Sequence, residues 1–177
     1  AAMLPLLGEH FANAGSVTHA AGRAVASQVD SAIADTARMI GASDDELVIT
    51  SGATESNNLA LLGACLHPRQ TRRKVVSVVT EHKAVLDPLS RLKQHGFEIE
   101  LVPVTDRSMS TAGLIVMDAL ASAVDDRTAL VSVMLANNEI GALQPLPQIA
   151  ELCRATGCLL HTDATQAVGR MAVDVDA

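Results

Sequence analysis

The chain has 177 residues, and its 13 lysines and arginines are outnumbered by 20 aspartates and glutamates, which gives a formal net charge of −7. That charge argues against sequence-independent nucleic-acid binding, which needs a positive face. No apolar run reaches the ~20 residues needed to span a bilayer. Hydrophobic residues make up 49% of the chain and aromatic residues 1%, so we expect a folded domain with an aliphatic core.

The predicted elements alternate between helices and strands. Apolar residues at helical spacing predict a helix over 22–40, closed by Gly41. Glu46–Thr50 (ELVIT) is predicted to be a short strand, and 54–66 a helix that ends before Pro68. Further strands are predicted at 75–79, 97–102, 129–135 and 158–161, and further helices at 83–95, 116–124 and 146–156. This alternation predicts an α/β domain with a mainly parallel sheet and right-handed connections.

Four polar clusters directly follow predicted strands. They are Ser51–Asn58, Thr80–His82, Asn137–Glu139 and Asp163–Gln166. Because ligands of open parallel sheets bind beyond the carboxyl ends of the strands, we expect these clusters to meet in one site.

Two of the clusters indicate groups that could hold opposite ends of a ligand. Ser51–Thr54 forms a turn into a helix whose free N–H groups could cradle an anion; the alternative is an ordinary N-cap made by Ser51 or Thr54. Neither a Walker loop nor a GxGxxG motif is present. Asp163 could pair with a protonated ring nitrogen, or could instead cap the following turn.

The remaining polar residues favour a flat, hydrogen-bonding ligand without specifying a reaction. His82 could stack on a heterocycle or move protons, or could be a satisfied loop residue. Asn138 and Gln166 offer amide donors for a hydroxyl or a carboxylate. Asn137 and Glu139 could instead serve the turn.

Other polar features are interpreted as structural. Cys65, Cys153 and Cys158 lack CxxC spacing, which favours three free, buried thiols in a reducing cytoplasm over a disulfide or a zinc site. No set of metal ligands is apparent. The basic run Arg69–Lys74 is interpreted as a solvated loop rather than a phosphate-binding patch.

Four segments together resemble one family. They are Thr50–Asn58 (TSGATESNN), Thr80–Val85 (TEHKAV), Asn137–Gly141 (NNEIG) and Asp163–Gly169 (DATQAVG). In order and spacing they resemble the cysteine desulfurases of the NifS/IscS-like branch, in the class-V aminotransferase family. The resemblance covers essentially the whole chain. It implies a three-layer large domain of the type I pyridoxal-phosphate (PLP) fold, with a mainly parallel sheet between helices.

The resemblance also implies an activity and its partners. The expected enzyme is a homodimer that uses PLP to convert L-cysteine to L-alanine. Its sulfur is left as a protein persulfide for a sulfur-acceptor protein, as in iron–sulfur cluster assembly. The implied cofactor-binding residues are Ala53, Thr54, His82, Asn138, Asp163 and Gln166.

Each of these residues has an implied role. Ala53 and Thr54 would hold the phosphate, and His82 would stack on the ring and act catalytically in proton transfer. Asn138 would lie near both the ring hydroxyl and the substrate carboxylate, Asp163 would pair with the ring nitrogen, and Gln166 would bond the ring hydroxyl.

Some functional parts of the family are expected outside these 177 residues. They include the Schiff-base lysine, the loop cysteine that takes the sulfur, the arginine that binds the substrate carboxylate, the small C-terminal domain and the extreme N-terminus. We therefore expect residues 1–177 to form part of the PLP-binding large domain and to be inactive alone. The alternatives are a non-catalytic domain of this fold, or a different PLP-dependent lyase or aminotransferase.

Overall fold

The computed structural model describes residues 3–16 and 18–176 and divides the chain into two compact units. Ala1–Ile49 and Met171–Ala177 form the N-terminal unit, and Thr50–Arg170 form the sheet unit.

The N-terminal unit is built on helix α1 (Ala20–Met39), which confirms the first predicted helix. His19 caps it, because its Nδ1 accepts a hydrogen bond from the Gly22 N–H at 2.9 Å. Gly22 is required by close packing, since a Cβ there would lie 2.0 Å from the Ser16 carbonyl oxygen. Two short 3-10 helices, η1 (Leu4–Leu7) and η2 (Asp44–Glu46), were not predicted.

The strand predicted at Glu46–Thr50 is wrong. Glu46 ends η2, Leu47 is extended, and residues 47–50 pair with no strand among the residues that the structure describes. Val48 and Ile49 are 69% and 70% exposed. A β-branched run favours extended backbone, but a strand also needs a hydrogen-bonding neighbour, which the local sequence cannot supply.

The sheet unit contains a four-stranded parallel sheet in the order β2-β1-β3-β4. The strands are β1 (Lys74–Val78), β2 (Glu98–Val102), β3 (Thr128–Ser132) and β4 (Leu159–His161). Backbone pairing of the last two continues past the strand ends, because Leu135 N–H donates to the Asp163 carbonyl at 3.0 Å. The predicted parallel sheet is confirmed.

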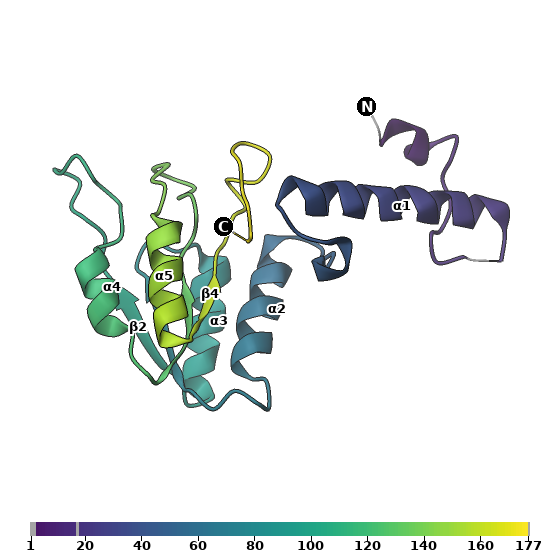
Figure 1. Cartoon of the computed structure of the whole chain (residues 1–177). Helices are drawn as coiled ribbons and strands as arrows, with labels where there is room; N and C mark the ends of the chain where they lie inside the picture. The colour runs from purple at the N-terminus through teal and green to yellow at the C-terminus, as the bar shows by residue number, and fades with distance from the viewer. Residues whose placement is uncertain (1–2, 17, 177) are drawn as a thin grey trace. The chain divides into compact units, whose positions relative to one another are not determined.

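Helices cover both faces of this sheet (Figure 1). On one face, α2 (Ala53–Cys65) and α3 (Lys83–Gln94) pack with Val75 in a buried hydrophobic core. On the other face, α4 (Met117–Ala123) and α5 (Leu146–Thr156) pack with Val76 and Val78. Successive residues of β1 thus face opposite cores, as the pleat requires, and the predicted three layers are confirmed.

The order of the strands creates a switch point between β1 and β3. The chain leaves β1 through α3 to reach β2 on one side, and leaves β3 through α5 to reach β4 on the other. Right-handed connections that run in opposite directions put their helices on opposite faces. The carboxyl ends of β1 and β3 therefore diverge into different layers, and this is where such sheets bind ligands.

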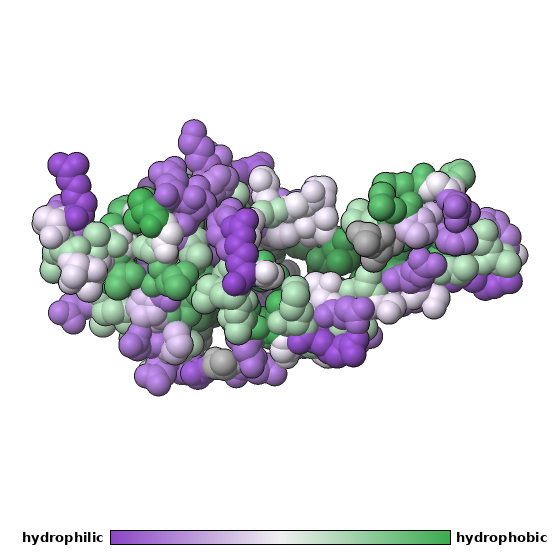
Figure 2. All heavy atoms as spheres, turned by 90° about the horizontal axis from the view of Figure 1, so that it is seen from above, coloured by the Kyte–Doolittle hydropathy of each residue, from purple (hydrophilic) through white to green (hydrophobic). Residues whose placement is uncertain are grey.

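Loops that follow the strands form the upper edge of the sheet unit in Figure 1. Figure 2 looks down on this edge and shows apolar side chains beside strongly polar ones. Large apolar side chains exposed in these loops are Met109, Ile140, Leu143 and Val168. Within the described residues, no helix combines the length and the apolar character needed to cross a membrane.

Candidate functional site

A pocket of about 130 Å³ opens at the carboxyl edge of the sheet. It is lined by Ala53, Thr54, His82, Ala84, Met134, Ala136, Asn138, Asp163, Thr165 and Gln166. The structure therefore brings all six residues selected from the sequence to one cavity. They come from the start of α2 and from the segments after β1, β3 and β4.

The first turn of α2 leaves its N–H groups without a side-chain cap. Gly52 occupies the N-cap position with φ 154° and ψ 177°, a region that only glycine adopts readily. Ser51 does not cap the helix, because its hydroxyl donates to Glu55 Oε2 at 2.6 Å. The alternative of an ordinary cap by Ser51 or Thr54 is therefore wrong. The uncapped N–H groups and the positive end of the helix dipole can receive an anion.

Asp163 presents an ionised carboxylate to the same pocket. Its Oδ2 accepts from Asn57 Nδ2 at 2.8 Å, and its Oδ1 accepts from the Thr165 N–H at 2.9 Å. Burial alone would raise the pKa of Asp163, but the hydrogen bonds from Thr165 and Asn57, with His161 nearby, outweigh it and lower that pKa. Such a carboxylate suits a cationic ring nitrogen.

His82 lies at the mouth of the pocket as the N-cap of α3. Its Nδ1 accepts from the Ala84 N–H at 3.1 Å, so the neutral ring carries its proton on Nε2. The hydrogen bond fixes the ring while Nε2 stays available to a ligand. Lys83, the next residue, is exposed on the first turn of α3 and does not line the pocket.

Amide side chains complete the wall. Asn138 lines the pocket, and Gln166 accepts from Arg170 through Oε1, which leaves its side-chain NH2 as a donor. Asn137 serves the turn instead, because its Oδ1 accepts from the N–H groups of Glu139 and Ile140 at 2.9 and 3.0 Å.

Two supporting residues were not selected from the sequence. Asn57 is 4% exposed and carries the Asp163 contact; with Leu61 and Cys65 it forms the buried i, i+4, i+8 row of α2. A polar residue on the apolar face of a predicted helix was the sequence signal that could have identified Asn57. Glu81 is 6% exposed, and its Oε1 accepts from the Met134 N–H at 2.6 Å. Its signal was its place three residues after the fully buried strand β1.

The donor set fits PLP, which would place its phosphate at Ala53 and Thr54 and its ring nitrogen at Asp163. An uncapped helix start suits a phosphate, and an ionised half-buried carboxylate suits a pyridinium. Among the described residues, no group of three His, Cys, Asp or Glu side chains could hold a metal ion.

Comparison with known proteins gives one consistent result. The cysteine desulfurase IscS of Neisseria meningitidis is 45% identical over 175 residues, which are 99% of this chain and 42% of that protein. A solved NifS-like protein superimposes with a TM-score of 0.89 at 31% identity, over 98% of this chain and 47% of its own. A solved structure described as SspA in complex with cysteine gives 0.86 at 31% identity, over 98% and 48%.

The chain thus spans less than half the length of the relatives it matches. Its fold is that of the PLP-dependent enzymes of fold type I, to which these structural neighbours belong. The family model for class-V aminotransferases matches residues 1–177. With a family match over its full length, the chain belongs to the class-V aminotransferase family.

Proposed function

We propose that this chain is the cofactor-facing part of the large domain of a PLP-dependent cysteine desulfurase. The activity would convert L-cysteine to L-alanine and leave the sulfur as a protein-bound persulfide. The Neisseria relative is named a cysteine desulfurase, and one solved neighbour is described as a complex with cysteine.

One observation carries the proposal. A single pocket is lined both by an uncapped helix start and by the ionised carboxylate of Asp163. A ligand with a phosphate at one end and a basic ring nitrogen at the other satisfies both groups at once. PLP is such a ligand, and when bound it supplies an electron sink.

Each pocket residue of this chain would then have its own role in binding PLP or in proton transfer. The first turn of α2, with Ala53 and Thr54, would bind the phosphate, and Asp163 would hold the proton on the ring nitrogen. His82 would lie on the ring face and move a proton through Nε2, the nitrogen that its Ala84 hydrogen bond leaves free. Asn138 and Gln166 would bond the ring hydroxyl, and Asn138 would also approach the substrate carboxylate.

The same proposal assigns the remaining requirements to the wider protein. The Schiff-base lysine, the sulfur-accepting cysteine and the arginine for the substrate carboxylate would lie outside residues 1–177. A homodimer would cover exposed apolar side chains of the strand-end loops such as Ile140 and Leu143. We further propose a cytoplasmic location, which suits the three free cysteines, and a sulfur-acceptor protein as partner.

The test is an assay of the full-length protein with L-cysteine, in which alanine is measured by chromatography and sulfide by colorimetry in the presence of a thiol reductant. Equal amounts of both products are expected. Asp163→Asn removes the negative charge that would hold the ring nitrogen proton, so turnover should fall about a hundredfold or more.

Asp118→Asn provides the matched control, because Asp118 is exposed on α4, on the side of the sheet away from α2. It should retain full activity. Transfer of an amino group from cysteine to an oxo acid, without sulfide, would contradict the proposal and indicate an aminotransferase of the same fold.

A further inference from the structure

Two segments that diverge at the switch point are joined by buried hydrogen bonds. The segment after β1 carries His82 and Ala84 into the pocket, and the segment after β3 carries Met134, Ala136 and Asn138. Their strands pair only as far as Ser77 and Ser132, so beyond this point the β ladder no longer fixes their spacing. Side-chain hydrogen bonds must therefore fix the spacing between the two segments.

Glu81 makes the first of these links. Its side chain is 6% exposed, and Oε1 accepts a hydrogen bond from the Met134 N–H at 2.6 Å across 53 residues of sequence. The second link runs the other way, from Asn137 Nδ2 to the Thr80 carbonyl at 3.1 Å. Both links lie directly beside residues that line the pocket.

We propose that Glu81 is a positioning residue of the candidate site, whose carboxyl group holds the segment after β3 against the segment after β1 and so sets the spacing between His82 and Asn138. The inference deepens the proposed function, on which it rests for the identity of the pocket ligand. Glu81 itself does not line the pocket, so it acts through the backbone it holds.

The charge state of Glu81 supports this role. Its Oε2 is buried without a partner among the described residues. Burial raises the pKa of Glu81 to about 8, with Asp163 adding to the rise and the N–H groups of Met134 and His82 opposing it. His161, the titratable group next to Asp163, has a pKa lowered by burial. A neutral Glu81 therefore leaves Asp163 as the one negative charge among these three side chains.

The experiment measures binding of 4′-deoxypyridoxine 5′-phosphate to the full-length protein freed of its cofactor. This analogue lacks the aldehyde, so it reports the non-covalent pocket alone. Glu81→Ala removes the Met134 link, and the dissociation constant should rise about tenfold. Glu81→Gln keeps a carbonyl acceptor for the Met134 N–H, so affinity should stay within about twofold of wild type.

Ser77→Ala is the matched structural control. The Ser77 hydroxyl is fully buried and donates to the Ser132 carbonyl at 2.9 Å, so its loss removes a buried link between the same two strands farther from the pocket. This variant should be destabilised while analogue affinity stays unchanged. Equal weakening in Ser77→Ala and Glu81→Ala, or wild-type affinity in Glu81→Ala, would overturn the inference.

A second readout separates this inference from the proposed function. If wild-type protein binds none of the analogue, the cofactor assignment fails, and the backbone amide resonances of His82 and Asn138 then decide the role of Glu81. Shifts of both resonances in Glu81→Ala but not in Glu81→Gln would support positioning. Unchanged resonances in both variants would refute it.

Discussion

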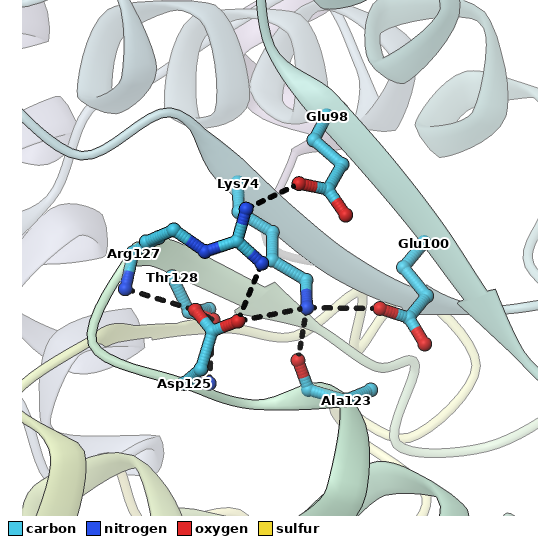
Figure 3. A network of polar contacts seen from close by, with 7 residues as sticks. All are labelled: Lys74, Glu98, Glu100, Ala123, Asp125, Arg127 and Thr128. Carbon is cyan, nitrogen blue, oxygen red and sulfur yellow. Dashed lines mark hydrogen bonds and ion pairs between the residues drawn. The ribbon is translucent and has the colours of Figure 1, made fainter.

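Lys74 joins three elements at the amino edge of the sheet, opposite the pocket (Figure 3). It begins β1, and its side chain is 5% exposed. Its Nζ donates to the Ala123 carbonyl at 2.5 Å, at the end of α4, and lies 2.9 Å from Glu100 on β2 and 3.2 Å from Asp125 before β3. Lys74→Met keeps the apolar stem and removes the ammonium group, both its charge and its hydrogen-bond donors, so it tests this junction directly.

The loss of stability in Lys74→Met depends on whether water can replace the ammonium group at each of its partners. The Ala123 carbonyl loses its buried donor, which costs about 1–3 kcal/mol. Glu100 and Asp125 are 43% and 33% exposed, so water can solvate their carboxylates. The loss of their ion pairs with Lys74 therefore adds little to the destabilisation. We expect about 2 kcal/mol in total, equivalent to about thirtyfold faster exchange of the amides in β1 and β3.

Hydrogen exchange followed by mass spectrometry on the full-length protein measures this change in peptides that contain 74–78 and 128–132. Arg127→Met is the matched control: Arg127 pairs with the same Asp125 and with Glu98, but its side chain is 60% exposed, so a far smaller change is expected. Equal acceleration in both variants, or none in Lys74→Met, would refute the assignment of Lys74 as the junction.

The same junction has a defined pH dependence. Burial would lower the pKa of Lys74, but Glu100 and Asp125 outweigh it and raise that pKa above its ordinary value of 10.5. The folded chain therefore holds this proton more tightly than the unfolded chain. The stabilisation is complete below pH 10.5 and is lost as pH rises through the raised value, so wild type and Lys74→Met should converge in strongly alkaline solution.

Three further outcomes are expected. Because the pKa of Glu81 is raised from 4.5 to about 8, the unfolding free energy of wild type should fall relative to Glu81→Gln as pH rises through that window; parallel curves would contradict this. Gly52→Ala puts a methyl group into free space but on a backbone conformation that only glycine adopts readily, so it should lower the free energy of unfolding by about 1–3 kcal/mol. It should also weaken the binding of inorganic phosphate measured by calorimetry, and unchanged phosphate affinity would count against phosphate binding at the start of α2. Borohydride treatment of the isolated 177-residue chain with PLP should give no stoichiometric adduct on Lys83 by mass spectrometry, because this lysine does not line the pocket; a stoichiometric adduct there would show that it reaches the cofactor.

The layered fold was predictable because its signals are local. The strands are short segments rich in apolar and β-branched residues, as in the Val-Val-Ser-Val segment Val75–Val78, and a glycine closes several helices, as Gly157 does in the left-handed conformation after α5. Polar clusters directly after such strands must share one edge of a parallel sheet. That geometric necessity placed His82 and Asp163 together without any knowledge of strand order.

Charged residues show where local signals fail. The basic run Arg69–Lys74 was expected to be a solvated loop, which is wrong for two of its members. Arg72 donates to the carbonyls of Thr128 and Thr156 at 3.0 and 3.1 Å, and Lys74 is buried at the junction described above. The backbone carbonyls that accept these hydrogen bonds belong to α4, β3 and α5 and lie 49 or more residues away in the sequence. Composition alone cannot reveal acceptors at that distance.

The same limit separates the pocket residues from those that support them. Asp163 and His82 follow strands and can be selected by position, whereas Asn57 acquires its role only through Asp163, 106 residues later, and Glu81 only through Met134. Both supports are buried, with Asn57 4% and Glu81 6% exposed, so each replaces lost water with one defined contact. A buried polar residue beside a predicted ligand group is therefore best interpreted through the long-range partner it must have. Glu81 is the strongest example: one carboxyl oxygen is bonded to Met134, and the other is buried with no partner in the part of the chain that the structure describes.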